Sequence, residues 1–201
     1  LKNAKLTKAI ANGFDRQELA DLVLKDGAKG AGYFVPEKLA VSPAGKDFRE
    51  ENGYDFFKEG PDQAKAYGQE AFKELKKDKL DLELLFEDTE ASKNVAEFIQ
   101  AQLEKNIDGL TINLKSQPKK ARIQLQNDGD YQLALHRWGP DYPDPQTYLE
   151  MYLKDSANNY GKYDNEAYDQ MILEAIGGGL SDEDRWTKLL EAEKLLLEEG
   201  Q

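Results

Sequence analysis

The middle of the chain alternates strand-like and helix-like patterns, and this order restricts the possible folds more than any other feature. Residues 79–86 and 110–114 alternate apolar and polar side chains, and residues 131–136 form a third, largely apolar run. Helical patterns at 90–105 and 119–126 separate these three predicted strands. A β-α-β-α-β order predicts a parallel sheet with right-handed crossovers. We therefore expect an α/β fold in which helices flank a small, mainly parallel sheet.

Helices are also predicted on both sides of this segment. Residues 4–24 carry apolar side chains at helical spacing, weakened at Gly13, and residues 62–76 form a second helical pattern. Asp15 and Glu18 resemble a capping box, so a restart of the first helix at Asp15 is the alternative to one continuous helix. Capping residues at 164–165 and at 181–184 predict the starts of two further helices. Three strands are few for this number of helices, so we expect further strands of the sheet to lie beyond both ends of the chain.

The least regular part of the chain is residues 27–60. Prolines and glycines interrupt it, and five aromatic residues are scattered along it: Tyr33, Phe34, Tyr54, Phe56 and Phe57. A structureless loop of this length is unusual inside a compact domain, so we expect the aromatic side chains to pack it down. The simplest interpretation is a surface cover, and contact with a ligand is the alternative.

Composition excludes several functions. The net charge of the 201 residues is 27 − 39 = −12, which argues against nucleic acid and against an anionic membrane surface. With no cysteine, the chain has no disulfide, thiolate metal site or cysteine nucleophile. No apolar run is long enough to span a membrane. The chain begins at Leu1 rather than at a methionine, so we expect a fragment of a longer protein.

Few residues point to catalysis. The single histidine, His136, lies at the end of a predicted strand, where a structural role is the simpler interpretation. Asp141 and Asp144 are three residues apart, and a carboxylate pair would suit a hydrolase. The acidic turn at 127–130 lacks the ligand pattern of a calcium loop, and no glycine-rich phosphate loop follows a strand. We therefore expect no metal and no cofactor.

Residues 137–145, here called the central loop, follow the third predicted strand. The loop holds three of the seven prolines, one of the two tryptophans and two aspartates. Proline restricts its own backbone and that of the preceding residue, so the loop is predicted to be rigid. Loops after the strands of α/β sheets line ligand crevices. From these residues alone, a ligand site and a turn with buried aromatic side chains remain equal alternatives.

The central loop and its surroundings resemble a known family. Residues 131–145 are similar to the hallmark segment of oligopeptide-binding proteins of ABC importers, in family 5 of the extracellular solute-binding proteins, and the similarity continues through 148–169. Upstream, residues 9–16 resemble a helix of the same family. Residues 46–49 and 86–89 resemble its Gram-positive branch.

The resemblance implies one lobe of a periplasmic-binding-protein-like (type II) fold. Proteins of this family trap a peptide between two lobes joined by hinge strands. Residues 1–201 match only the C-terminal lobe, so the N-terminal lobe would be a missing partner of this single lobe. The resemblance further implies a non-enzymatic protein outside the cytoplasm, as a cell-surface lipoprotein or a periplasmic protein, which delivers oligopeptides to an ABC permease in the membrane.

The resemblance also assigns a site. The family aspartate that pairs with the peptide α-ammonium group falls on Asp141, and a partly buried carboxylate would give a charge-assisted bond there. Trp138 and Tyr142 would form walls of the site, and Gly139 and Asn159 complete the implied ligand-binding set. Two other interpretations stay open: a carboxylate-dependent hydrolase, and a lobe for a different solute such as nickel or a sugar.

Three features of the sequence depart from, or add to, this pattern. Gly177–Gly179 stands where the family has a segment richer in helix-forming residues. Three consecutive glycines are typical of a shortened or engineered join between two segments. Gly68 stands where a large helical residue is usual. Asp144 is expected to cap the helix that follows the central loop.

Overall fold

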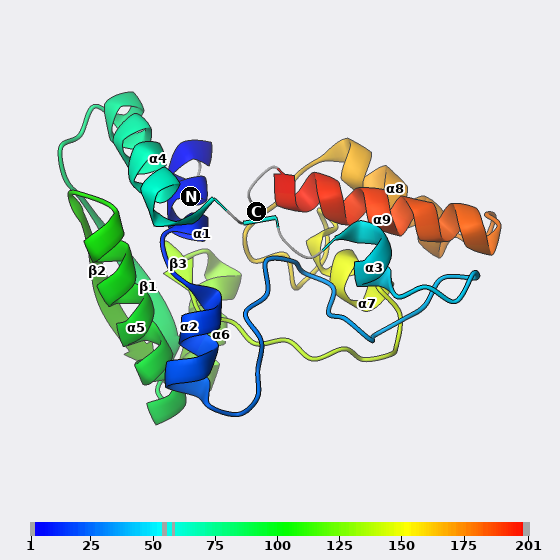
Figure 1. The fold of residues 1–201 in the computed structure, drawn as a ribbon, viewed down its shortest axis with the longest axis horizontal. Helices are drawn as coiled ribbons and strands as arrows, with labels where there is room; N and C mark the ends of the chain where they lie inside the picture. The colour runs from blue at the N-terminus through cyan, green and yellow to red at the C-terminus, as the bar shows by residue number, and fades with distance from the viewer. Residues whose placement is uncertain (1–2, 54–55, 58, 199–201) are drawn as a thin grey trace. The chain divides into compact units, whose positions relative to one another are not determined.

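The computed structural model describes residues 3–53, 56–57 and 59–198 (Figure 1). Tyr54 of the irregular segment and the first two residues lie outside the described residues. The chain divides into two compact units, which are treated separately below. Unit 1 contains the described residues of 3–30 and 57–137, and unit 2 contains those of 31–56 and 138–198. Whether 1–201 forms a single lobe of a longer protein stays a prediction.

Unit 1 is built on the predicted parallel sheet. Its elements are α1 (Ala4–Asn12), α2 (Arg16–Leu19), the π-helix η1 (Ala20–Leu24), α4 (Gly60–Leu75), β1 (Leu80–Glu87), α5 (Glu90–Asn106), β2 (Leu110–Gln117), α6 (Lys119–Asp128) and β3 (Leu133–Ala134). The strand order is β2-β1-β3, and both pairings are parallel. The α/β fold class with a small parallel sheet is therefore confirmed.

The third strand is much shorter than predicted. β1 pairs with β2 along its whole length, whereas β3 pairs only through Leu133 and Ala134. The side-chain oxygen of Gln132 accepts the backbone N–H of Glu83 (2.7 Å) in place of a backbone carbonyl, which interrupts the ladder at one end. At the other end, the last bond runs from the N–H of Leu135 to the carbonyl of Leu85 (2.8 Å). The prediction of a strand over 131–136 was thus wrong in length but right in place.

The first predicted helix is divided into separate pieces. α1 ends at Gly13, where an added Cβ would lie 2.6 Å from Leu103, and Asp15 begins α2 by accepting the N–H of Glu18 (2.8 Å). The side chain of Glu18 does not return the bond. Instead, Gln102 accepts the N–H of Asp15 (3.0 Å) and donates to Glu18 (2.5 Å). The restart of the helix at Asp15 is therefore confirmed, whereas the capping box with Glu18 was wrong, because Gln102 of α5 completes the cap.

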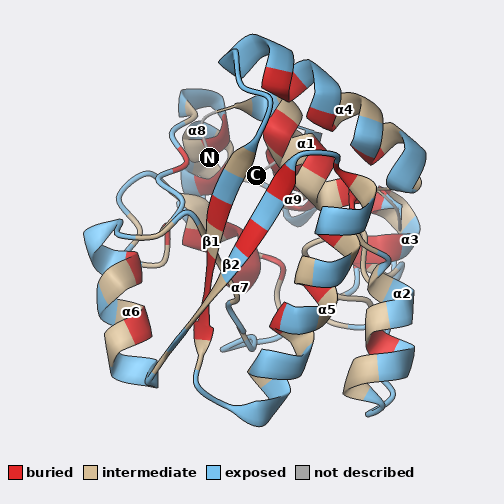
Figure 2. Cartoon of the chain, turned by 90° about the vertical axis from the view of Figure 1, so that its left-hand side faces the viewer, coloured by how far each residue is buried: buried red, intermediate tan, exposed pale blue. Residues whose placement is uncertain are grey.

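One face of the sheet in unit 1 makes the core. Leu82, Leu84 and Phe86 alternate along β1, and they pack with Ile112 of β2 against buried side chains of α1, α4 and α5. Figure 2 shows this alternation as buried bands along β1 and β2. The other face carries the fully buried Leu85 together with polar side chains, and Lys115 pairs there with Glu83 (2.8 Å). Period-two burial on one face explains why these strands could be predicted from their pattern.

Unit 2 is helical and irregular. Its elements are α3 (Phe48–Asn52), α7 (Gln146–Leu149), the 3-10 helix η2 (Glu150–Tyr152), α8 (Glu166–Ile176) and α9 (Asp182–Glu198). Of the two predicted caps for α8, Asn165 is the one used, accepting the N–H of Tyr168 (3.1 Å). Ser181 caps α9 through the N–H of Asp184 (3.1 Å). The short helix α3 falls in the segment expected to be irregular.

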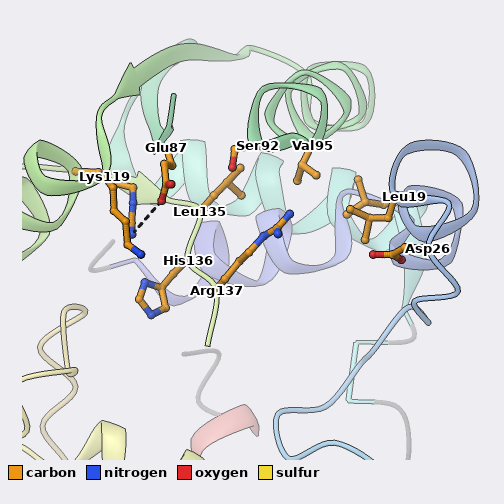
Figure 3. A pocket seen from close by; sticks show the side chains of 11 residues that line it. Leu19, Asp26, Glu87, Ser92, Val95, Lys119, Leu135, His136 and Arg137 are labelled. Atoms are coloured by element: carbon orange, nitrogen blue, oxygen red, sulfur yellow. Dashed lines mark ion pairs between the residues drawn. The ribbon is translucent and has the colours of Figure 1, made fainter. Parts of the chain in front are cut away.

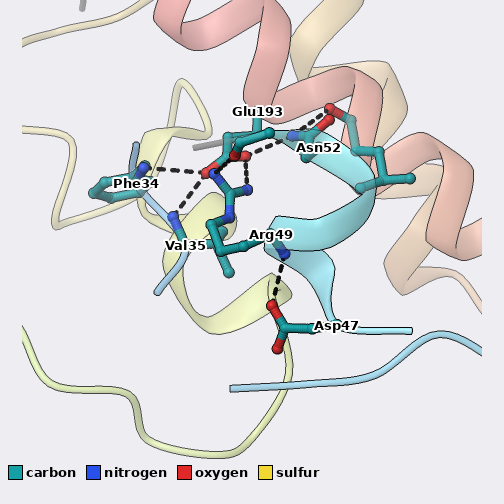
Figure 4. Close-up of polar contacts among 8 residues, drawn as sticks. Phe34, Val35, Asp47, Arg49, Asn52 and Glu193 are labelled. Carbon is teal, nitrogen blue, oxygen red and sulfur yellow. Dashed lines mark hydrogen bonds and ion pairs between the residues drawn. The ribbon is translucent and has the colours of Figure 1, made fainter. Parts of the chain in front are cut away.

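A buried charge network fastens the segment between Phe34 and Asn52 to α9 (Figure 4). Glu193 pairs with Arg49, and both side chains are fully buried. The other carboxylate oxygen of Glu193 accepts the backbone N–H groups of Phe34 (3.1 Å) and Val35 (2.7 Å). Asn52 also donates to Glu193 (2.5 Å). The segment packs down as expected, but a charged network holds it as well as aromatic side chains.

Candidate functional site

The central loop enters unit 2 at Trp138 and is held by short-range bonds. The hydroxyl of the buried Thr147 accepts the backbone N–H of Asp141 (3.1 Å), and the N–H of Asp144 bonds to the carbonyl of Tyr142 (2.9 Å). These bonds connect the loop to the start of α7. Together with its prolines, they give Asp141 a fixed backbone position.

Asp144 has a structural role. Its carboxylate accepts the N–H of Gln146 (2.9 Å), the first residue of α7, from the position before the N-cap, which is Pro145 rather than the predicted Asp144. It also forms two parallel bonds with the guanidinium of Arg185 in α9 (3.0 and 2.8 Å). A bidentate arginine pair is among the stronger polar contacts in proteins. With its oxygens used in this way, Asp144 is poorly placed to act as a catalytic partner of Asp141.

A pocket of about 410 Å³ opens beside the central loop. It is lined by Trp138, Asp141, Thr147, Glu150, Met151, Leu153, Lys154, Asp155, Ser156, Asn158, Asp169 and Leu173. Four of these residues are carboxylates and one is a lysine, and Lys154 pairs with Asp164 (2.8 Å) outside the lining. The lining also includes the apolar side chains of Met151, Leu153 and Leu173. The pocket therefore favours a positively charged group that is attached to an apolar or neutral body.

Asp141 and Asp155 are the two carboxylates of this pocket that accept no hydrogen bond from a described residue. Glu150 accepts bonds from Tyr142 (3.0 Å) and Gln146 (2.9 Å), and Asp169 accepts the N–H of Lys154 (3.1 Å). Within the described part of the chain, no donor bonds to the Asp141 carboxylate, which is exposed rather than partly buried as expected. A carboxylate without a protein partner is available to a ligand.

Trp138 lies at the pocket with a donor that has no acceptor. Its ring is half-buried against the apolar cluster of unit 2. Its Nε1 atom is buried, and no acceptor for it is present among the described residues. Buried donors are usually satisfied, so this unpaired indole N–H is an exception within unit 2.

Tyr142 and Gly139 contribute in different ways. The hydroxyl of Tyr142 donates to Glu150, and desolvation together with that carboxylate raises the pKa of Tyr142 to about 12. Tyr142 does not line the pocket itself but fixes Glu150, which does. Gly139 is exposed, and a Cβ added there would meet nothing within 4 Å. Packing does not explain the glycine at this position.

Asn159 is used inside unit 2. Its buried amide donates to the carbonyls of Leu153 (3.2 Å) and Tyr163 (2.8 Å), and its oxygen accepts the N–H of Tyr163 (2.9 Å). These bonds close the loop that carries Asp155 and Asn158 into the pocket lining. The geometry supports a positioning role for Asn159, and direct contact with a ligand stays a prediction.

Several pocket residues were missed by the sequence interpretation: Glu150, Met151, Asp155, Asp169 and Leu173. They come from η2, α8 and the loop between them, up to 35 positions after Trp138. Asp155 and Asp169 fall within the stretch that resembles the family, which was the available signal. Their convergence with the central loop depends on tertiary packing and has no local pattern.

His136 belongs to unit 1 and is not among the residues that line this pocket. It lines a different pocket, at the end of β3 (Figure 3). Partial burial and the positive charge of Arg122 lower its pKa below the usual 6.5. Among the described residues, no three His, Cys, Asp or Glu side chains gather as a metal site would require. Nor is any helix in that part of the chain both long and apolar enough to cross a membrane.

The comparison with protein families gives a clear result. Residues 1–160 match the family model described as bacterial extracellular solute-binding proteins, family 5, middle region. The chain belongs to this family. Its members are extracellular solute-binding proteins by that description.

Individual relatives agree. The dipeptide-binding protein DppE of Bacillus subtilis (strain 168) is 31% identical over 200 residues, which are 99% of this chain and 36% of the relative. The dipeptide-binding protein of Lactococcus lactis subsp. cremoris (strain MG1363) is 31% identical over 87% of this chain and 32% of its own length. The chain thus spans about a third of the length of these curated relatives. Both organisms are Gram-positive, so the resemblance to that branch is confirmed.

Solved structures share the fold. The substrate-binding domain of an oligopeptide ABC transporter from Bacillus anthracis (strain Ames) matches with a TM-score of 0.92 and 41% identity, over 99% of this chain and 38% of that one. A peptide-binding protein of a peptide ABC transporter matches with a TM-score of 0.93 and 32% identity, over 98% of this chain and 88% of that one. The similarity to oligopeptide-binding proteins of ABC transporters is therefore confirmed.

Proposed function

We propose that this chain is the C-terminal lobe of an oligopeptide-binding protein that captures peptides outside the cytoplasm for uptake by an ABC permease. The observation that carries the proposal is the acidic pocket of unit 2, in which the Asp141 carboxylate has no protein donor. The names of the relatives, which refer to dipeptides and oligopeptides, give the substrate class. An N-terminal lobe would supply the other side of the cleft, and a lipid anchor or the periplasm would retain the protein.

In this proposal, Asp141 accepts a charge-assisted bond from the peptide α-ammonium group. Every linear peptide with a free amino terminus carries this group, so the anchor is independent of peptide sequence. Trp138, whose side chain lines the pocket, would cover the first residues of the peptide. Glu150, Asp155 and Asp169 would add a negative potential that attracts the cation.

The proposal includes no covalent chemistry. A hydrolase would need a second carboxylate free to exchange protons with Asp141. Asp144, the nearest candidate in sequence, is bound by Arg185 and by the N–H of Gln146. No observation in unit 2 favours the hydrolase over binding.

An Asp141→Asn variant tests the anchor. A short apolar peptide with a free amino terminus is titrated into the isotope-labelled chain, and its affinity is measured from NMR chemical shifts, which detect weak binding. We expect the variant to bind ~10- to 100-fold more weakly, the usual value of a hydrogen bond to a charged group. The N-acetylated peptide should bind weakly to both proteins.

Asp182→Asn is the matched control, because Asp182 is an exposed carboxylate of the same unit that does not line this pocket. Its affinity should equal that of the original chain. Equal binding of acetylated and free peptides, or equal affinities of the Asp141 and Asp182 variants, would refute the anchor.

A further inference from the structure

The pocket beside the central loop keeps a second free carboxylate after Asp141 is assigned to the peptide amino terminus. Asp155 also lines this pocket, and no described residue donates a hydrogen bond to its carboxylate. Its side chain is exposed, in the loop between η2 and α8. Asn159 holds that loop by bonds to the backbone of Leu153 (3.2 Å) and of Tyr163 (2.8 and 2.9 Å). The backbone of Asp155 is therefore held in place while its carboxylate remains available to a ligand.

The charge of the pocket lining indicates what this carboxylate would bind. Four carboxylates and one lysine line the pocket, which gives 1 − 4 = −3, and a bound α-ammonium group changes this only to −3 + 1 = −2. The pKa of Lys154 is raised, first by its hydrogen bond to Asp164. The charges of Asp155 and Asp169 raise it further, so both carboxylates act on a cation at the pocket. A second positive charge on the ligand is therefore favoured.

The same pocket offers an apolar wall to the ligand. Met151, Leu153 and Leu173 line the pocket, and Leu173 is 58% exposed. A lysine or arginine side chain lays its carbon atoms along apolar surface and keeps its charged end at a polar group. The volume of about 410 Å³ lies within the ~300–1,000 Å³ of typical ligand pockets, so there is room for a side chain together with the amino group.

We propose that Asp155 makes this pocket select peptides whose first residue is lysine or arginine. The inference rests on the proposed function, in which Asp141 holds the α-ammonium group. The side-chain cation of the same peptide residue then pairs with Asp155, while its carbon atoms lie on Leu153 and Leu173. Two cations on one residue of the peptide thus meet the two carboxylates of the pocket that have no protein donor.

Neighbouring polar groups support this selection. Asn158 lines the pocket, and its side-chain amide has no partner among the described residues, so its oxygen can accept a further hydrogen bond from the cation. Glu150 and Asp169 are engaged by protein donors, so they contribute negative potential rather than direct pairing. A peptide that begins with glutamate would bring a carboxylate into this acidic lining and should bind least well.

Three tripeptides that differ only in the first residue test the preference: Lys-Ala-Ala, norleucyl-Ala-Ala and Glu-Ala-Ala. Norleucine keeps the carbon chain of lysine without its ammonium group. Each peptide is titrated into the isotope-labelled chain at constant ionic strength, and its affinity is measured from NMR chemical shifts. We expect Lys-Ala-Ala to bind about three- to fivefold more tightly than the norleucine peptide, the effect of an exposed ion pair, and Glu-Ala-Ala to bind most weakly.

Variants of the two carboxylates separate this inference from the anchor. Asp155→Asn, at an exposed position, should reduce the ratio of the lysine and norleucine affinities to about one. Asp141→Asn should weaken the binding of all three peptides and keep that ratio, and Asp182→Asn, outside the pocket, should change neither. A ratio near one in the original chain, or a ratio that survives in Asp155→Asn, would overturn the inference and leave the anchor intact. Equal affinities of Asp141→Asn and the original chain would instead refute the anchor, and with it the inference.

Discussion

The two units each bury one arginine among their described residues, and the two arginines are bonded differently. In unit 2, Arg49 pairs closely with Glu193, donates to the carbonyl of Gly53 (3.1 Å) and lies over the rings of Tyr33 and Phe48. In unit 1, the carboxylate nearest to Arg122 is 3.8 Å away, and the side chain lines a pocket. The Nε atoms of both arginines are buried without an acceptor among the described residues, so the difference lies in the close carboxylate partner that Arg49 has and Arg122 lacks.

Substitution of the two carboxylate partners should show this difference most strongly. Glu193→Gln leaves Arg49 buried without a counter-charge and should lower the free energy of unfolding by ~3–5 kcal/mol. Glu87→Gln removes a partly exposed carboxylate that lies 3.8 Å from Arg122, and it should lower the free energy of unfolding by about 1 kcal/mol or less. Urea denaturation of both variants measures the difference. Equal losses would show that the two arginines serve the same structural purpose.

A smaller effect is expected at two glycines, one in each unit. A Cβ added at Gly68 in α4 would lie 2.7 Å from Ile107, so the usual large residue is excluded by close packing. Overpacking in Gly68→Ala should lower the free energy of unfolding by ~1–3 kcal/mol. The higher helix propensity of alanine should offset ~1 kcal/mol of this loss.

Gly139→Ala is the matched control, because it meets nothing within 4 Å. Its effect on thermal or urea unfolding should lie within about 0.5 kcal/mol. A Gly68→Ala variant as stable as the original chain would contradict the packing explanation for the departure from the family pattern.

The parts of the fold that follow local periodicity could be predicted from the sequence. β1 and α5 lie where alternation and helical spacing placed them, because each buries one face on a continuous core. The contacts between distant residues could not be predicted. Glu193 and Arg49 are 144 positions apart, and Arg185 and Asp144 are 41 apart, and neither pair has a local sequence signal.

The candidate site shows the same division. Asp141 and Trp138 were chosen through the resemblance, and the structure places both on one pocket. The acidic side chains that surround Asp141 come from later turns and could not be assembled by spacing alone. The pocket of unit 1 that His136 lines could not be predicted from the sequence. No local pattern marks Arg122 and Arg137 as pocket residues, because the fold brings them together.

The acidic pocket should also produce a small effect at high pH. The pKa of Tyr142 is about 12, above its usual value of 10.0, because of desolvation and Glu150. The contribution of the Tyr142 hydroxyl to the free energy of unfolding should be complete below pH 10. It should be lost as the pH rises from 10 to about 12, because the tyrosine of the unfolded chain loses its proton first. Glu150→Gln should reduce this loss. A pH dependence that is the same in both proteins would contradict this role for Glu150.

The central claim, that the acidic pocket of unit 2 receives a peptide amino terminus, is tested most directly by the two indole N–H signals of the chain. Trp138 lines the pocket, and its Nε1 atom has no acceptor among the described residues, whereas Trp186 does not line the pocket and its Nε1 atom donates to Glu51 (2.5 Å). A peptide with a free amino terminus should shift the Trp138 signal and leave the Trp186 signal in place, and the N-acetylated peptide should shift neither. Unchanged signals at saturating peptide, or equal shifts of both signals, would contradict the claim.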